Sequence, residues 1–286
     1  MSVITFINSE PEETGKTMSL VAIATYMAVN YNNRILVIST TNTEDKINSC
    51  YFSEQKARNA RLRLLGAKTN SLETESGMEG LAKMARSNKL TPEVITNYTK
   101  VVFSNRLEII PGVDKNKIHN EIGNDKIVDE EYIALIDTAK MYYDQVFVDL
   151  DMNITEEVRQ AIIQNSDLII ENTTQNLKSI DKLRQRKENS ELLKSPKTLI
   201  LVGKYDNTSK YNVKNITRYL GEKNKVLAVP YNTLFMEAAN EAGVADFFIS
   251  LKKIMNADSQ NGIFAEEVKR ATEAILYRLQ ELHAMV

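Results

Sequence analysis

Short, continuously apolar runs alternate with longer helical patterns along most of this 286-residue chain. The first run is 3–7 (Val-Ile-Thr-Phe-Ile), and the helical pattern at 17–30 places Leu20, Ile23 and Met27 on one face. Further strands are predicted at 35–39, 107–110, 145–149, 167–170, 198–202 and 226–229, and further helices at 132–141, 175–186, 213–220 and 265–284. Strands that are apolar throughout are typical of a parallel sheet buried on both faces. The sequence therefore predicts an α/β fold, a doubly wound and mostly parallel sheet with helices on both faces.

Composition and charge exclude several classes of protein. A net charge of -2 gives no bulk field that would favour nucleic acid or an anionic membrane. The single cysteine excludes an internal disulfide and fits a reducing compartment. We see no signal peptide, no apolar run of about 18 residues and no flexible linker. We therefore expect a cytoplasmic protein with no integral membrane segment, folded as one domain over residues 1–286.

The chain is poor in glycine, and this bears on where it can bind phosphate. It holds 10 glycines, where average usage predicts roughly 20. In open α/β sheets, ligands bind at the carboxyl ends of the strands, so the link 8–17 after the first strand is the first candidate. The phosphate-loop signature GxxxxGK[ST] belongs there, but only Gly15, Lys16 and Thr17 match it. Acids stand in the rest of the loop: Glu10, Glu12 and Glu13.

Two interpretations of this loop stay open. In the first, Gly15 lets the backbone approach a phosphate, Lys16 supplies a point charge and the Thr17 hydroxyl ligates Mg²⁺. The helix N-terminus that follows adds free N–H donors and a partial positive charge. In the second, the loop is a structural turn whose own glutamates satisfy that helix N-terminus, with no nucleotide.

Several segments at the predicted strand ends share the pattern of one family of ATPases. They are 11–17 (Pro-Glu-Glu-Thr-Gly-Lys-Thr), 34–41 (Arg-Ile-Leu-Val-Ile-Ser-Thr-Thr), 77–81 (Gly-Met-Glu-Gly-Leu), 107–111 (Leu-Glu-Ile-Ile-Pro), 143–149 (Tyr-Asp-Gln-Val-Phe-Val-Asp), 199–206 (Leu-Ile-Leu-Val-Gly-Lys-Tyr-Asp), 229–232 (Val-Pro-Tyr-Asn) and 235–243. With these segments the chain resembles the ParA/MinD group of P-loop ATPases over nearly its whole length.

The resemblance implies ATP and Mg²⁺ as ligands, with the base lying between the ends of the strands near 199–206 and 226–229. It implies nucleotide contacts from Thr14, Gly15, Lys16, Thr17, Met18, Lys204, Pro230, Tyr231 and Asn232. Thr17 and Asp149 would hold Mg²⁺, and Lys16 and Asp149 would take part in catalysis. Asp149 has a second interpretation, an exposed strand-end acid with a capping role.

The chain departs from the family pattern at positions that the resemblance links to dimerisation, hydrolysis and contact with the base. Pro11 occupies the place of the signature lysine, which reaches across a nucleotide-sandwich dimer in the family. Ser39 and Thr41 replace the two acids of the Asp-x-Asp strand end, and Gly203 replaces an asparagine that contacts the base. After Asp149, Leu-Asp replaces the usual Thr-Pro or Ser-Pro. The resemblance with these departures implies slow or absent ATP hydrolysis.

The run 230–235, Pro-Tyr-Asn-Thr-Leu-Phe, resembles the pilus-assembly branch of the family, the TadZ/CpaE type. The function it implies is a positioning or assembly factor for an envelope machine such as a Tad-type pilus. Such a protein would form a homodimer, bind protein partners of that machine, and be recruited to the inner face of the membrane or to a cell pole. Two alternatives stay open: a ParA-type partition ATPase on nonspecific DNA, and a nucleotide-free scaffold.

Other features have both a plain and a functional interpretation. The basic segment 56–63 is either a solvated helix face or a patch for DNA or a partner. The helix at 265–284 is amphipathic and faces the core or a dimer partner, or it lies on a membrane surface. His119 and His283 lack metal-ligand spacing, and Cys50 shows no sign of being a nucleophile.

Overall fold

The computed structural model describes residues 1–8, 13–41, 46–53, 77–112, 126–253 and 258–285. Within them an eight-stranded sheet has the order β3-β4-β2-β5-β1-β6-β7-β8. The strands are β1 Ser2–Ile7, β2 Ile35–Ser39, β3 Lys100–Phe103, β4 Leu107–Ile110, β5 Gln145–Asp149, β6 Leu168–Thr173, β7 Thr198–Tyr205 and β8 Leu227–Pro230. Neighbouring strands are parallel except β3 and β4, which are antiparallel.

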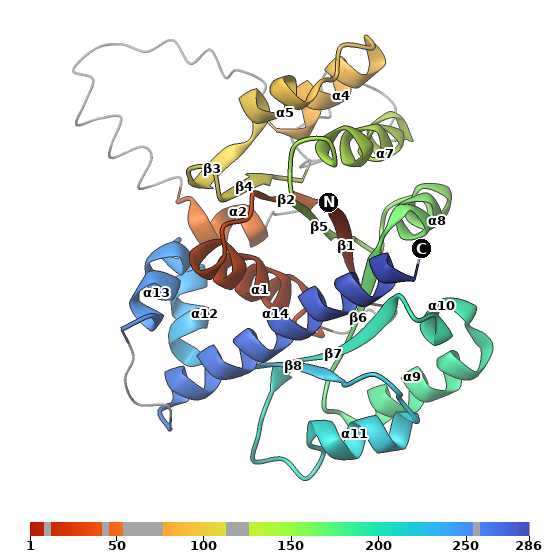
Figure 1. Cartoon of the computed structure of the whole chain (residues 1–286), viewed down its shortest axis with the longest axis vertical. Coiled ribbons are helices and arrows are strands. Elements are labelled where there is room, and N and C mark those ends of the chain that lie inside the picture. The colour runs from red at the N-terminus through yellow and green to blue at the C-terminus, as the bar shows by residue number, and fades with distance from the viewer. Residues whose placement is uncertain (9–12, 42–45, 54–76, 113–125, 254–257, 286) are drawn as a thin grey trace.

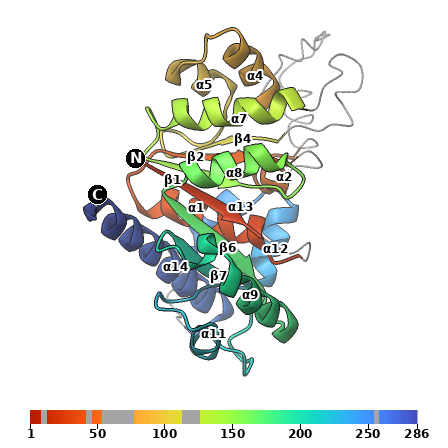
Figure 2. The ribbon, with the colours of Figure 1, turned by 90° about the vertical axis from the view of Figure 1, so that its right-hand side faces the viewer.

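Helices cover both faces of the sheet (Figures 1 and 2). On one face lie α1 Lys16–Asn30, α2 Lys46–Tyr51, α12 Thr233–Asn240, α13 Val244–Leu251 and α14 Gln260–Ala284. On the other lie α4 Met78–Arg86, α5 Pro92–Tyr98, α7 Lys126–Ala139, α8 Glu156–Asn165, α9 Leu177–Asn189, α10 Glu191–Lys194 and α11 Val213–Leu220. The predicted doubly wound fold is confirmed.

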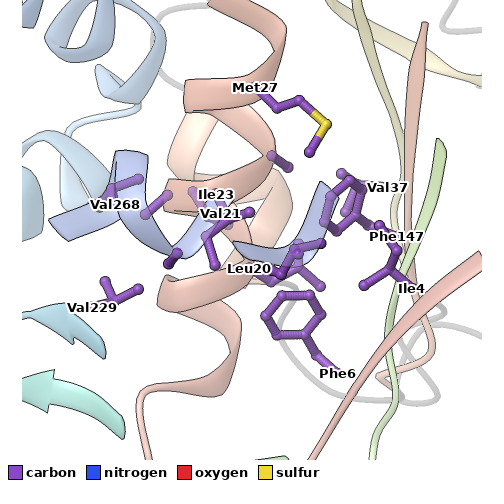
Figure 3. Packing of buried hydrophobic residues seen from close by; sticks show 14 of the residues in the cluster. Ile4, Phe6, Leu20, Val21, Ile23, Met27, Val37, Phe147, Val229 and Val268 are labelled. Atoms are coloured by element: carbon purple, nitrogen blue, oxygen red, sulfur yellow. The ribbon is translucent and has the colours of Figure 1, made fainter. Parts of the chain in front are cut away.

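The central strand β1 divides its side chains between the two faces. Ile4 and Phe6 pack with α1, whereas Val3 and Ile7 pack with the helices opposite. Figure 3 shows Leu20 of α1 close to Phe6 of β1 and Met27 of α1 pointing towards Val37 of β2, and all four residues are buried. Because α1 is held along its length, its first turn has a fixed position at the carboxyl end of β1.

The C-terminal helix begins at Gln260, earlier than the predicted 265. Ser259 caps it, since its Oγ accepts a hydrogen bond from the Gly262 N–H at 3.0 Å. Val268 and Ile275 are fully buried against the sheet and α1, so this helix packs into the core. In the part of the chain that the structure describes, no helix is long and apolar enough to cross a membrane.

Candidate functional site

Gly15 and Gly203 bring the start of α1 close to the end of β7. Gly15 has φ 76, a left-handed conformation that suits glycine, and it is the N-cap of α1. A Cβ at Gly203 would lie 2.2 Å from the Thr14 carbonyl oxygen, so only glycine fits there without movement of the backbone. The departure from asparagine at Gly203 therefore has a packing reason: the loop before α1 lies directly on β7.

Lys16, Thr17 and Asp149 meet at the carboxyl ends of β1 and β5. Lys16 Nζ lies 2.8 Å from Asp149 Oδ1, and the Thr17 hydroxyl donates to Asp149 Oδ2 at 2.7 Å. Lys16 also donates to the Leu150 carbonyl. Only 11% of the Lys16 side chain and 8% of the Asp149 side chain are exposed. Asp149 is thus a buried, ion-paired carboxylate rather than an exposed strand-end acid.

The first turn of α1 has the properties of an anion site. It carries no side-chain cap and no acidic residue, so its leading N–H groups and the positive end of its dipole are not compensated by a side chain. The Thr14 hydroxyl is buried and makes no hydrogen bond within the described residues. Free N–H donors at a helix N-terminus, beside a lysine, are the groups that phosphate recognition uses.

Glu13 is the one loop glutamate within the described residues, and its carboxylate does not cap α1. It pairs with Lys204 Nζ at 3.1 Å, and 82% of its side chain is exposed. This hydrogen bond and the Lys204 charge lower the pKa of the Glu13 carboxyl from its ordinary value. Glu10, Pro11 and Glu12 lie outside the described residues.

The residues predicted beside the base lie at the ends of β7 and β8. Lys204 has φ 51, an uncommon value for a residue with a side chain, and Tyr231 is 58% exposed. The Tyr231 N–H donates to the Tyr205 carbonyl at 3.0 Å and joins the two strand ends, beside half-buried Pro230. The remaining predicted contact of the loop, Met18, is half-buried with its side chain against the core.

The side chain of Asn232 is already engaged in the fold. Its Oδ1 accepts from the Phe235 N–H at 2.8 Å, which caps α12, and its Nδ2 donates to Asn261 Oδ1 at 2.8 Å. Only 3% of the residue is exposed. A base contact from this side chain would compete with the cap. The role of Asn232 in the described structure is therefore to cap α12 and hold its start in place.

Two residues near the site were not predicted. The Thr40 hydroxyl donates to the Asp149 carbonyl at 3.2 Å and accepts from the Asp151 N–H at 2.8 Å, tying β2 to β5. Asn172 Nδ2 donates to the Ile7 carbonyl at 3.3 Å, and its buried Oδ1 has no partner in the described parts of the chain. Both are buried polar residues at ends of apolar strands, and that position was the signal available in the sequence.

The remaining residues named in the sequence analysis add no charged or metal-binding group to the candidate site within the described residues. Ser39 and Thr41 place no carboxylate at the end of β2, and the Ser39 Oγ accepts from the Thr41 N–H at 3.4 Å. Cys50 is buried in α2, and His283 is exposed in the last turn of α14. The segment 56–63 and His119 lie outside the described residues. Among the residues described, no group of three or more His, Cys, Asp or Glu could hold a metal ion by itself.

Comparison with known proteins shows the fold. No family model and no curated protein matches the chain. A ParA family ATPase from Chlorobium tepidum TLS superposes with TM-score 0.65 at 16% identity, over 94% of this chain and 97% of that one. A putative plasmid partition protein from Borrelia burgdorferi, bound to AMPPNP, gives 0.61 at 16% identity, over 97% and 99%.

The septum site-determining protein MinD from Pyrococcus horikoshii, complexed with Mg-ADP, gives a TM-score of 0.60 at 12% identity, over 93% of each chain. Both this neighbour and the Borrelia protein hold a nucleotide, as their descriptions state. At such identities the likeness establishes the ParA/MinD-type P-loop fold and leaves the activity to be argued from this chain's own residues.

Proposed function

We propose that this chain is a nucleotide-binding switch that binds ATP with Mg²⁺ at residues 14–18 and hydrolyses it slowly or not at all. The observation that carries the proposal is the contact of Lys16 and Thr17 with Asp149 beneath the uncapped N-terminus of α1. These groups suit a polyphosphate: N–H donors, a lysine charge and two hard oxygens close together.

Each residue has a role that follows from its atoms. The amides of residues 15–18 and Lys16 Nζ would bind the phosphates, and Thr17 Oγ1 with Asp149 would hold Mg²⁺, directly or through water. When bound, the metal would neutralise phosphate charge. In the structure Lys16 is paired with Asp149, so it would turn from that carboxylate towards a phosphate on binding. The pairing of Glu13 with Lys204 reduces the repulsion that a loop glutamate would exert on the ligand.

Slow hydrolysis is proposed because the chain has few groups to orient an attacking water. Ser39 and Thr41 carry hydroxyls where the family pattern has carboxylates, and a hydroxyl does not act as a general base at neutral pH. Pro11 stands at the place of the signature lysine. Occupancy by ATP, more than its turnover, would then set the state of the protein.

For the cellular role we propose a positioning or assembly factor of an envelope machine such as a Tad-type pilus. The support is the run at 230–235, which forms the end of β8 and the start of α12 beside the candidate site. Such a factor would work as a homodimer on protein partners at the inner face of the membrane or at a cell pole. A slow switch suits this role because assembly needs a lasting bound state.

A partition ATPase is the second candidate, and one observation favours it. Two of the similar structures come from Borrelia burgdorferi proteins described as plasmid partition proteins. This candidate predicts ATP-dependent DNA binding that weakens steeply with salt, because phosphate contacts release counterions. A mobility shift of a nonspecific duplex with ATP, at two salt concentrations, would favour partition over envelope assembly.

Titration with ATP and Mg²⁺ in a calorimeter tests nucleotide binding. We expect binding by the natural chain and a loss of about tenfold or more in Lys16→Ala, with Lys89→Ala, an exposed lysine on another surface, unchanged. Circular dichroism checks that the variants fold, and Thr17→Val, which keeps the shape of the side chain, should remove the Mg²⁺ dependence.

No binding by the natural chain would support the scaffold alternative. Phosphate release at the rate of an efficient ATPase, abolished in Lys16→Ala, would contradict slow hydrolysis.

A further inference from the structure

The strand β8 forms one edge of the sheet and lies at the bottom of a groove. It pairs with β7 alone in the described sheet, and Val226, Leu227 and Val229 are buried, at 1%, 3% and 3% exposure. Figure 1 shows β8 between α14 and α11. A cavity of about 690 Å³ is lined by residues 225–228, which are the start of β8 and the two residues before it, and its walls come from these two helices. We call it the β8 groove.

The walls of the β8 groove are apolar and its rim is positively charged. Val213, Ile263 and Ala271 contribute apolar surface from α11 and α14. The rim carries these exposed cations: Lys214, Arg218, Lys223 and Lys225. No ion pair within the described residues neutralises any of these four.

The acids of the groove are already paired with other groups. Glu222 accepts from Lys187 Nζ at 2.5 Å, and Glu267 accepts from Arg270 Nη1 at 2.6 Å. The groove therefore has an excess of positive charge although the whole chain has a net charge of -2. Such a local excess selects a negatively charged occupant and increases its rate of association.

We propose that the β8 groove binds an extended, acidic segment of a partner protein, which adds to the sheet as a strand beside β8. An edge strand presents a row of main-chain N–H and C=O groups, and a peptide strand can pair with them. Alternate side chains of that peptide would enter the apolar walls, and its acidic residues would face the cations of the rim. The volume is within the range of pockets that enclose a ligand.

Two other interpretations explain less of the geometry. Lysines beside a short edge strand are a common protection against aggregation, but protection needs neither flanking walls nor a cavity. A nucleic acid duplex or a lipid surface would use the cations of α11 and the loop 221–225. Neither the rigid, wide phosphate backbone of a duplex nor a lipid surface would enter a groove with apolar walls. A narrow polypeptide therefore fits the groove better.

The groove contains none of the predicted nucleotide contacts, since it is lined by residues 225–228 while Pro230, Tyr231 and Asn232 lie at the other end of β8, so the proposal does not depend on nucleotide binding. Lys16, at the start of α1, and Asp149, at the end of β5, are further away, because β6 and β7 lie between β1 and β8. Experiments on the groove can therefore use the full chain without nucleotide.

A displayed library of random linear peptides tests the proposal. Peptides are selected on the full chain and counter-selected on Lys223→Glu/Lys225→Glu, with Lys89→Glu/Lys178→Glu as the matched control of two exposed lysines elsewhere. We expect enriched peptides to have a net negative charge with apolar residues at alternate positions. By fluorescence anisotropy, they should bind about tenfold more weakly to the groove variant, equally to the control, and more weakly in high salt.

Main-chain pairing needs its own readouts. Peptides that are N-methylated at alternate residues keep their side chains and lose one row of donors, so they should bind about tenfold more weakly. Hydrogen exchange of residues 226–229 should slow when the unmodified peptide binds. Enrichment of neutral or basic peptides, no enrichment, or unchanged binding after N-methylation would each overturn the proposal. So would duplex DNA or phosphatidylserine vesicles binding at Lys223 and Lys225 in place of any peptide.

Discussion

Gly203 is the residue at which the backbone of the candidate nucleotide loop packs most closely on the sheet. The ParA/MinD pattern that the sequence resembles has asparagine at this position, and the resemblance implies a contact of that side chain with the base. In this chain the space is filled by the Thr14 carbonyl, which would lie 2.2 Å from any Cβ at Gly203. The absence of an asparagine side chain and the close packing of the loop on β7 thus both follow from glycine at this position.

The first prediction concerns Gly203→Asn. It should lower the free energy of unfolding by about 1–3 kcal/mol, because the new Cβ would displace the backbone of Thr14. Gly221→Asn is the control. Gly221 has a positive φ of 62 but nothing within 4 Å of its Cβ position, and asparagine tolerates that conformation. Urea unfolding of the two variants measures the difference, and equal losses would show that contact with Thr14 is not the cause.

The ion pair of Glu13 and Lys204 gives a second prediction at this scale. A carbon NMR titration should find the pKa of Glu13 below its ordinary value, and Lys204→Ala should return it. Because this pKa is lowered, the pair is complete at neutral pH and is lost as the pH falls through the folded-state pKa. Lys204→Ala should also weaken ATP binding, since the Glu13 charge would then face the phosphates uncompensated. A Glu13 pKa that does not respond to Lys204→Ala would show that the two side chains are not paired in solution.

Among the elements, α14 shows how tertiary contacts extend a helix beyond its sequence pattern. Its first residues include Asn261-Gly262, a pair typical of turns, and they lie before the predicted helix start at 265. In the structure Phe264 is fully buried, and its ring centroid lies 5.1 Å from that of Phe235. The Ser259 cap and this aromatic contact stabilise a turn that local preference alone disfavours.

The third prediction separates these two contributions to α14. Phe264→Ala should lower the free energy of unfolding by about 3–5 kcal/mol, because it removes a buried ring and leaves a cavity. Ser259→Ala should cost about 1 kcal/mol, the usual effect of losing an N-cap hydrogen bond. Thermal and urea unfolding measure both. A larger loss from Ser259→Ala than from Phe264→Ala would contradict this account of the helix start.

The sequence predicts the central strands well, because strands that are buried on both faces of the sheet are apolar throughout. It misses β3, whose residues are half-buried or exposed, and α8, whose residues are mostly polar although Val158 and Ile162 are buried. It also ends β6 at 170, before Glu171 and Asn172, which look like loop residues. Glu171 is fully buried because Arg186 of α9 reaches it at 3.4 Å. In the candidate site, likewise, Gly15 to Thr17 form a local motif, whereas Thr40, Asn172 and the Glu13 pair depend on contacts between distant segments.

At the scale of the whole molecule, the parallel strands bring the candidate nucleotide site and a set of exposed apolar side chains to one edge. The loops and helix starts after β5, β6 and β8 carry Met152, Leu177 and Leu234, which are 39%, 45% and 50% exposed. Exposed apolar groups gathered on one face often mark a protein interface. The homodimer implied by the family resemblance would bury this edge together with the nucleotide.

The last prediction is that ATP with Mg²⁺, or a non-hydrolysable analogue, converts the chain from monomer to dimer in sedimentation velocity. Leu177→Glu/Leu234→Glu should keep ATP binding and lose the dimer, because two charges would be desolvated at the contact. Val101→Glu/Met141→Glu, at 51% and 68% exposure away from this edge, should dimerise normally. A monomer at saturating nucleotide would contradict the prediction, and a dimer in both double variants would place the contact on another surface. Lys16→Ala should stay monomeric, since a dimer that depends on bound ATP cannot form when the phosphates are not held.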